Sequence, residues 1–200
     1  MQGAQNKILT RIAKRGRGWA FSKVDFAADF RVDSIQKALT GLEQIGQIRR
    51  VMRGVYDYPK KSRALGGFRS PDMDQVAKAL ARKFGWRIQP TGEVALNLLG
   101  LSTQVPARWI YASDGPNRTY EIGVQSLEFR KTPLRESAFN SKDSGLLVQA
   151  IKALGRERIE DEQIRALKKQ FADQDGRRII QETKLAPDWI HAIIRSIWER

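Results

Sequence analysis

The residues with the clearest potential for chemistry lie on one face of a predicted helix in the first third of the chain. Ile35, Leu39 and Leu42 recur at helical spacing and are expected to face inward, so Gln36 and Lys37 point outward. A Gln amide can pair bidentately with the edge of adenine, and a Lys ammonium can reach guanine or a phosphate. Three further polar residues are expected to point outward: Ser34, Thr40 and Gln44. The alternative is an ordinary solvated helix face.

Basic residues surround this helix in the sequence. The candidates for neutralising phosphates are Arg31 before the helix, Arg49, Arg50 and Arg53 on a predicted hairpin after it, and Lys60, Lys61 and Arg63 beyond the hairpin. Residues 1–69 carry 15 Lys and Arg against 5 Asp and Glu, whereas residues 70–200 carry 21 against 17. This uneven charge indicates a polyanionic partner for the N-terminal part. An anionic membrane is a weaker candidate, because no basic amphipathic stretch stands apart from the globular pattern.

The elements that must position these side chains follow from periodicity and from cap residues. In order, they are a helix over 4–15, a short strand over 19–21, a helix from the Ser22 cap to Ala28, a helix from the Asp33 cap to Gly46, and a hairpin of 47–51 and 55–58 closed by Pro59. This is the order of a winged helix-turn-helix, whose third helix enters the DNA major groove while the hairpin forms the wing. A winged helix used for protein contacts is the alternative.

The remainder of the chain predicts a second domain. Residues 61–70 are basic and carry glycine, which is typical of a linker. The predicted elements beyond it are a helix from Asp72 to Phe84, strands over 108–113, 118–124 and 126–131, and helices from Asp143 onward. A turn at 114–117 favours an antiparallel sheet. We therefore expect an α+β protein, with a winged helix at 1–60, a linker at 61–70 and a mixed domain with a small antiparallel sheet and C-terminal helices at 71–200.

Residues suited to catalysis are few. The chain has no Cys and a single His, His191, and it has no phosphate-binding loop or nucleophile motif, so we expect no enzyme, metal or cofactor. If a catalytic site exists, its best location is a polar string in the second domain: Thr91, Asn97, Ser102, Thr103, Gln104 and Arg108. The simpler interpretation is that these are cap and turn residues. The N-terminus lacks the apolar core of a secretory signal and no run reaches the roughly 20 apolar residues of a membrane span, so we expect a cytoplasmic protein.

Two stretches of the sequence resemble a known family. The string FSKVDFAADFRVDSIQKALTGLEQIGQIRRVMRGVYDYP, with Arg53, Gly54, Val55, Tyr56 and Pro59 at its end, resembles the N-terminal domain of AbiEi-type antitoxins of type IV toxin–antitoxin systems. The string IQPTGEVALNLLGLSTQVPARWIYASDG is similar to uncharacterised bacterial proteins that share this domain. Together the stretches cover about residues 5–130.

This resemblance implies a particular function. It implies an abortive-infection regulator that binds its own promoter, with inverted repeats as the expected operator, and represses its operon. It also implies that the protein counteracts a nucleotidyltransferase toxin encoded beside it, without a stable complex; whether the two proteins touch is left open. One alternative is a stand-alone winged-helix transcription factor whose second domain senses a ligand or oligomerises. A nucleic-acid-modifying enzyme that docks through the winged helix is another.

Overall fold

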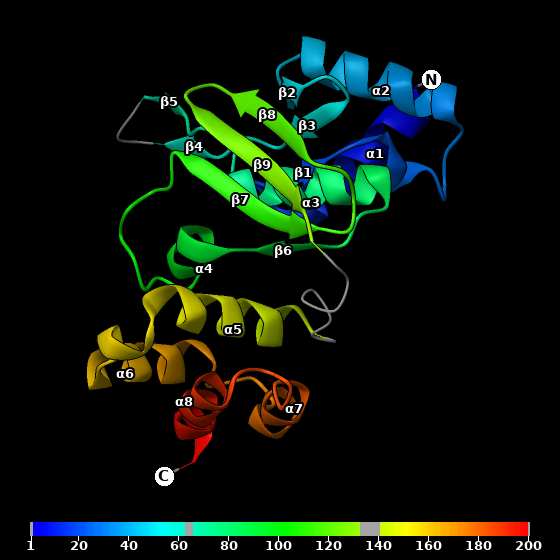
Figure 1. The fold of residues 1–200 in the computed structure, drawn as a ribbon. Helices are drawn as coiled ribbons and strands as arrows, with labels where there is room; N and C mark the ends of the chain where they lie inside the picture. Colours follow the sequence, from blue (N-terminus) through cyan, green and yellow to red (C-terminus); the bar gives the residue numbers. More distant parts are fainter. Residues whose placement is uncertain (1, 63–65, 133–140, 200) are drawn as a thin grey trace. The chain divides into compact units, whose positions relative to one another are not determined.

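The computed structural model describes residues 2–62, 66–132 and 141–199, and the chain forms two compact units, Met1–Trp86 and Arg87–Arg200 (Figure 1). Both units combine helices with small sheets, so the predicted α+β class is confirmed. The order of sheet and then helices in the second half of the chain is also as predicted.

The first unit begins with the predicted series of elements. They are helix α1 (Gln2–Arg15), strand β1 (Ala20–Phe21), the short 3-10 helix η1 (Lys23–Phe26), helix α2 (Val32–Gln44), and strands β2 (Arg49–Met52) and β3 (Val55–Asp57). The strands form an antiparallel sheet in the order β1-β3-β2, with β2 and β3 as a hairpin. This topology is compatible with a winged helix-turn-helix.

Apolar side chains from α1, β1, η1, α2 and β3, together with the residue before β2, form one core. It contains Ile8 and Ile12 from α1, Phe21, Phe26, four residues of α2, Ile48 and Tyr56. The predicted capping box is present, because the Ser22 side chain accepts from the Val24 amide and the Asp25 carboxylate accepts from the Ser22 amide. The start of α2 differs from the prediction. Arg31 occupies the cap position and Asp33 lies in the first turn, where its charge complements the helix dipole.

The segment predicted as a linker is part of the first unit. Strands β4 (Lys61–Ser62) and β5 (Gly67–Phe68) pair with each other, and helix α3 (Met73–Phe84) packs against β1, β3 and η1. Val76, Ala77 and Leu80 of α3 are fully buried. The division of the chain therefore falls after Trp86, and not within 61–70. Phe84, the last residue of α3, is 45% exposed.

The second unit contains a four-stranded sheet. Its elements are β6 (Ile88–Pro90), helix α4 (Gly92–Leu98), β7 (Arg108–Ser113), β8 (Arg118–Ile122) and β9 (Gln125–Lys131), with strand order β6-β7-β9-β8. The pairs β6–β7 and β8–β9 are antiparallel, as expected for this sheet, but β7 and β9 are parallel. The predicted turn at 114–117 therefore does not join paired strands. Its residues hold other segments instead: Asp114 accepts from Arg87, and the Asn117 side chain accepts from the Lys131 amide.

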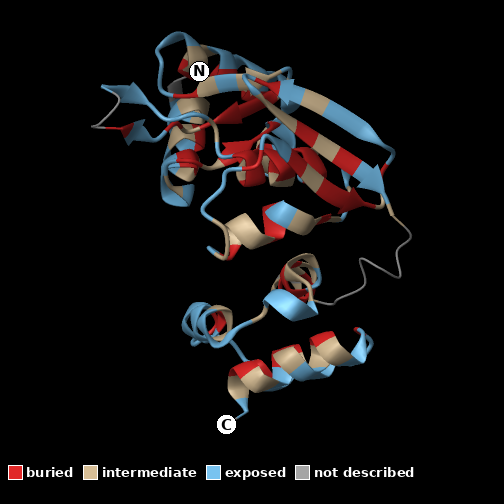
Figure 2. Ribbon diagram, turned by 60° about the vertical axis from the view of Figure 1, so that its left-hand side comes forward, coloured by how far each residue is buried: buried red, intermediate tan, exposed pale blue. Residues whose placement is uncertain are grey.

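Helices follow the sheet. They are α5 (Lys142–Leu154), the 3-10 helix η2 (Arg156–Arg158), α6 (Asp161–Gln170), α7 (Gly176–Glu182) and α8 (Asp188–Trp198). Buried and exposed residues lie on different sides of α8, near the C label of Figure 2. Its two tryptophans are partly buried against the core of this unit, and Trp198 packs closely over Gly176. The acidic residues 160–162 lie at the start of α6, with Glu160 in a capping box.

Candidate nucleic-acid interface

Helix α2 separates its apolar and polar residues as the sequence predicts. Ile35, Ala38, Leu39 and Leu42 are buried in the core of the first unit. The residues expected to point outward, Gln36, Lys37, Thr40 and Gln44, are all exposed. The Gln36 amide donates to the Thr40 hydroxyl at 3.4 Å, so these two side chains lie together one helical turn apart. The helix therefore presents a continuous polar stripe that the core does not use.

Ser34 has a less open position than the other predicted residues of α2. It is half-buried and lines a shallow hollow between the first turns of α1 and α2, together with Gln5, Asp33 and Lys37. The structure thus places Ser34 at the border of the stripe, on the side of α1.

The hairpin of β2 and β3 lies beside α2 (Figure 1) and carries two exposed arginines. The Arg50 guanidinium lies 5.7 Å from the ring centroid of Tyr56 and within 3.5 Å of its hydroxyl. Arg53 lies in the turn between the strands, next to Gly54, whose φ of +74° this tight connection uses. Within the described residues, neither arginine has a carboxylate at ion-pair distance.

Arg49 differs from its neighbours, because its guanidinium is hydrogen-bonded to other groups of the protein. It donates to both carboxylate oxygens of Asp57, at 3.0 and 2.5 Å, and to the carbonyl of Arg69 at 2.9 Å. The ion pair with Asp57, which is 1% exposed, lies within the β2–β3 hairpin, and the hydrogen bond to Arg69 joins the wing to the segment after β5. Arg49 is predicted to neutralise a phosphate, and the structure shows that its guanidinium also holds a buried carboxylate.

The remaining predicted cations surround the same unit. Arg31, Lys60 and Lys61 are exposed, and the aliphatic part of Lys60 lies across Gly18, where a Cβ atom would come within 2.5 Å of its Cε. Arg63 lies outside the described residues. The first unit as a whole contains 18 Lys and Arg against 7 Asp and Glu, counted over residues 1–86.

Lys83, a cation that the sequence analysis did not select, also reaches the wing. It comes from the last turn of α3, and its ammonium donates to the Arg53 carbonyl at 3.1 Å. Partial burial lowers the pKa of Lys83, and the nearby charges of Lys23 and Arg53 lower it further. Lys83 was not predicted as a site residue, because residues 71–200 were assigned to a second domain. The only signal for it in the sequence is the basic last turn of α3, which contains Arg82 and Lys83.

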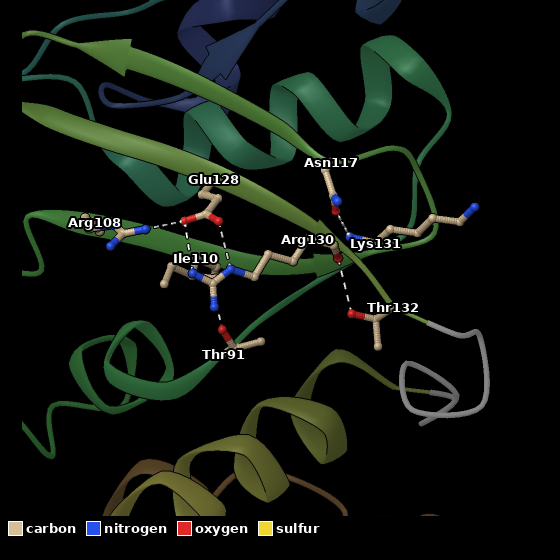
Figure 3. A network of polar contacts seen from close by, with 8 residues as sticks. All are labelled: Thr91, Arg108, Ile110, Asn117, Glu128, Arg130, Lys131 and Thr132. Atoms are coloured by element: carbon tan, nitrogen blue, oxygen red, sulfur yellow. Dashed lines mark hydrogen bonds and ion pairs between the residues drawn. The ribbon is translucent and has the colours of Figure 1, made fainter.

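Several basic residues of the second unit are in ion pairs, among them two arginines of its sheet. Glu128 accepts from Arg108 at 2.9 Å and from Arg130 at 2.8 Å, which lowers the pKa of its carboxyl group (Figure 3). Arg108 and Arg130 therefore already share a carboxylate within the sheet, whereas Arg118 and Lys131 are exposed with no ion pair among the described residues.

The polar string considered for catalysis makes local structural hydrogen bonds. The Thr91 hydroxyl donates to the Ile110 carbonyl (Figure 3), and the Asn97 amide donates to the Gln104 carbonyl. The Ser102 hydroxyl accepts from the Gln104 amide. His191 lies 3.4 Å from the Thr183 hydroxyl. In the described ranges, no three His, Cys, Asp or Glu residues gather as metal ligands, and no helix has the length and apolar character of a membrane span.

The fold and the interface define an α+β protein whose first unit is compatible with a winged helix-turn-helix. The chain belongs to DUF6088, a family of unknown function, whose profile matches residues 7–179. It is also similar to the crystal structure of the RV2827C protein from Mycobacterium tuberculosis, with 14% identity and a TM-score of 0.40, over 98% of this chain and 76% of that one. No curated protein matches the sequence.

Proposed function

We propose that the protein binds double-stranded DNA sequence-specifically through α2 and the β2–β3 wing. The observation that carries this proposal is the exposed stripe of Gln36, Lys37 and Thr40 on α2, in a unit whose wing carries the exposed Arg50 and Arg53. The amide and ammonium groups of the stripe match the hydrogen-bonding groups of base edges in the major groove. Arg50 and Arg53 are available for phosphates, because no carboxylate among the described residues neutralises them.

Charge supports the same partner. The first unit has 11 more basic than acidic side chains over residues 1–86, and an excess of this size draws a polyanion toward it from solution. Each phosphate contact releases counterions from the DNA, so binding is expected to weaken steeply as salt rises. We also propose a cytoplasmic location, where such a partner is present.

Replacing Gln36 tests whether α2 reads bases. Gln36→Ala is expected to reduce the preference for the recognised duplex over a scrambled one by about 1–3 kcal/mol, because the bidentate amide is lost. The fold is expected to persist, since Gln36 is exposed and its only described partner is Thr40. Fluorescence anisotropy with labelled duplexes from upstream of the gene measures both affinities.

The matched control is Gln170→Ala, which removes another exposed Gln side chain at a helix end in the second unit. This variant is expected to bind both duplexes as the unchanged protein does. If Gln36→Ala also left affinity and preference unchanged, α2 would not be the reading helix.

We further propose that the DNA bound is the protein's own promoter and that the protein acts as a type IV antitoxin. The support is the resemblance of residues 21–59 to the AbiEi N-terminal domain. The test is expression of the adjacent gene, where it encodes a nucleotidyltransferase, with and without this protein. Restored growth is expected for the antitoxin. Arrested growth in both cases would favour a stand-alone transcription factor whose second unit senses a ligand or oligomerises.

A further inference from the structure

Lys83 contacts the turn of the wing, and two further cations from separate elements lie close enough for their charges to act on it. Lys23 is the first residue of η1, Arg53 lies between β2 and β3, and Lys83 lies in the last turn of α3. One hydrogen bond joins α3 to the turn of the wing: the Lys83 ammonium donates to the Arg53 carbonyl at 3.1 Å. Lys23 and Arg53 are both close enough to Lys83 for their charges to lower its pKa, an effect that adds to partial burial. The three residues are called the wing-tip triad below.

Two carboxylates of the first unit are engaged by other groups. Asp25 accepts from Arg82 at 2.5 Å and from the Ser22 amide. Asp57 is held by Arg49. Among the residues that the structure describes, no carboxylate comes within ion-pair distance of Lys23, Arg53 or Lys83. The triad is therefore a concentration of positive charge that the fold leaves without a counterion of its own.

The backbone at the turn keeps the triad open. A Cβ atom on Gly54 would lie 3.1 Å from the Lys83 ammonium, and the φ of +74° at this position also disfavours any other residue. Without a side chain at this point, the ammonium rests over the turn.

We infer that the wing-tip triad is a phosphate-binding site that receives a backbone phosphate of the bound nucleic acid. The inference rests on the proposed function and extends its interface to α3, a helix outside the winged-helix elements. Gathering like charges is unfavourable in the free protein, and an anion placed among them relieves the repulsion and forms charge-assisted hydrogen bonds. A phosphate is the fitting anion, because η1, which carries Lys23, packs against the base-reading helix α2.

The first test compares two lysines of α3. Lys83→Gln is expected to lower affinity roughly tenfold on both the upstream and the scrambled duplex. The slope of log affinity against log salt is expected to fall by about 1, because one phosphate contact is lost. Lys78→Gln is the matched control, since Lys78 is already paired with Asp74 on the same helix. Equal salt slopes for the two variants would overturn the inference.

A second test does not depend on DNA binding. Inorganic pyrophosphate is titrated into the full chain while the lysine side-chain resonances are followed by nuclear magnetic resonance. The Lys83 and Lys23 resonances are expected to shift first and to saturate together, whereas the Lys78 resonance moves little. If Lys83 responded no more than Lys78, the site would be refuted even where the protein binds DNA. A saturating Lys83 shift in a protein that fails to bind duplexes would instead refute the proposed function and leave the anion site intact.

Discussion

Arg49→Ala is expected to lower the free energy of unfolding of the first unit by about 3 kcal/mol, because it leaves a buried carboxylate without its partner. Asp57 is 1% exposed and accepts two hydrogen bonds from Arg49. The value lies at the lower end for such pairs, since the Arg49 side chain remains 31% exposed and water can reach it. Urea unfolding followed by circular dichroism, with hydrogen exchange of amides in the first unit, measures the loss.

Arg50→Ala is the matched control, because it removes a neighbouring guanidinium on the same strand that faces solvent. Its effect on the free energy of unfolding is expected to stay within about 0.5 kcal/mol. Among the folded molecules, Arg50→Ala is expected to weaken DNA binding more than Arg49→Ala does. The double variant Arg49→Met with Asp57→Leu is expected to recover much of the stability, since no charge is then left unpaired. If Arg49→Ala instead kept full stability and only weakened DNA binding, Arg49 would be a phosphate contact.

Gly176→Ala is expected to destabilise the helical part of the second unit by about 3 kcal/mol through overpacking. A Cβ atom at this position would lie 2.4 Å from both Cγ and Cδ1 of Trp198. Rotation of the ring cannot relieve the contact, because Cγ is bonded directly to the Cβ of Trp198. The indole also packs edge-on against Phe171, with ring centroids 6.2 Å apart, so relief requires a change of χ1 that breaks this contact or a shift of α8. Thermal unfolding measured by calorimetry gives the size of the effect.

Trp198→Leu provides the second half of this comparison. The combined variant Gly176→Ala with Trp198→Leu is expected to be less destabilised than the sum of the two single changes, because the leucine leaves room for the new methyl group. Additive effects would show that the close approach of Gly176 and Trp198 does not limit packing here.

Local signals in the sequence were enough to predict the first elements of the fold. Ser22 and Asp25 define a capping box that the structure contains, and the spacing of Ile35, Leu39 and Leu42 predicts the buried face of α2. The same spacing, by elimination, predicts the exposed position of Gln36. Each of these features depends on residues a few positions apart, which periodicity and cap preferences describe well.

Features that depend on distant residues were not predictable in this way. The amphipathic pattern of α3 shows that one face is buried, but not that β1, β3 and η1 cover it. The parallel pairing of β7 with β9 arises because β9 lies between β7 and β8, an order that turn residues at 114–117 do not specify. Likewise, the type and position of Arg49 suit a phosphate contact, and only the location of Asp57 across the hairpin reveals its ion pair.

The most direct test of sequence-specific DNA binding is a fluorescence anisotropy titration of the full chain. It uses a labelled duplex from upstream of the gene and a scrambled duplex of equal length and composition, at several salt concentrations. The proposal predicts tighter binding to the upstream duplex, with log affinity falling linearly as log salt rises. Equal and weak binding to both duplexes would contradict it, because the positive charge of the first unit would then attract any polyanion without reading a sequence.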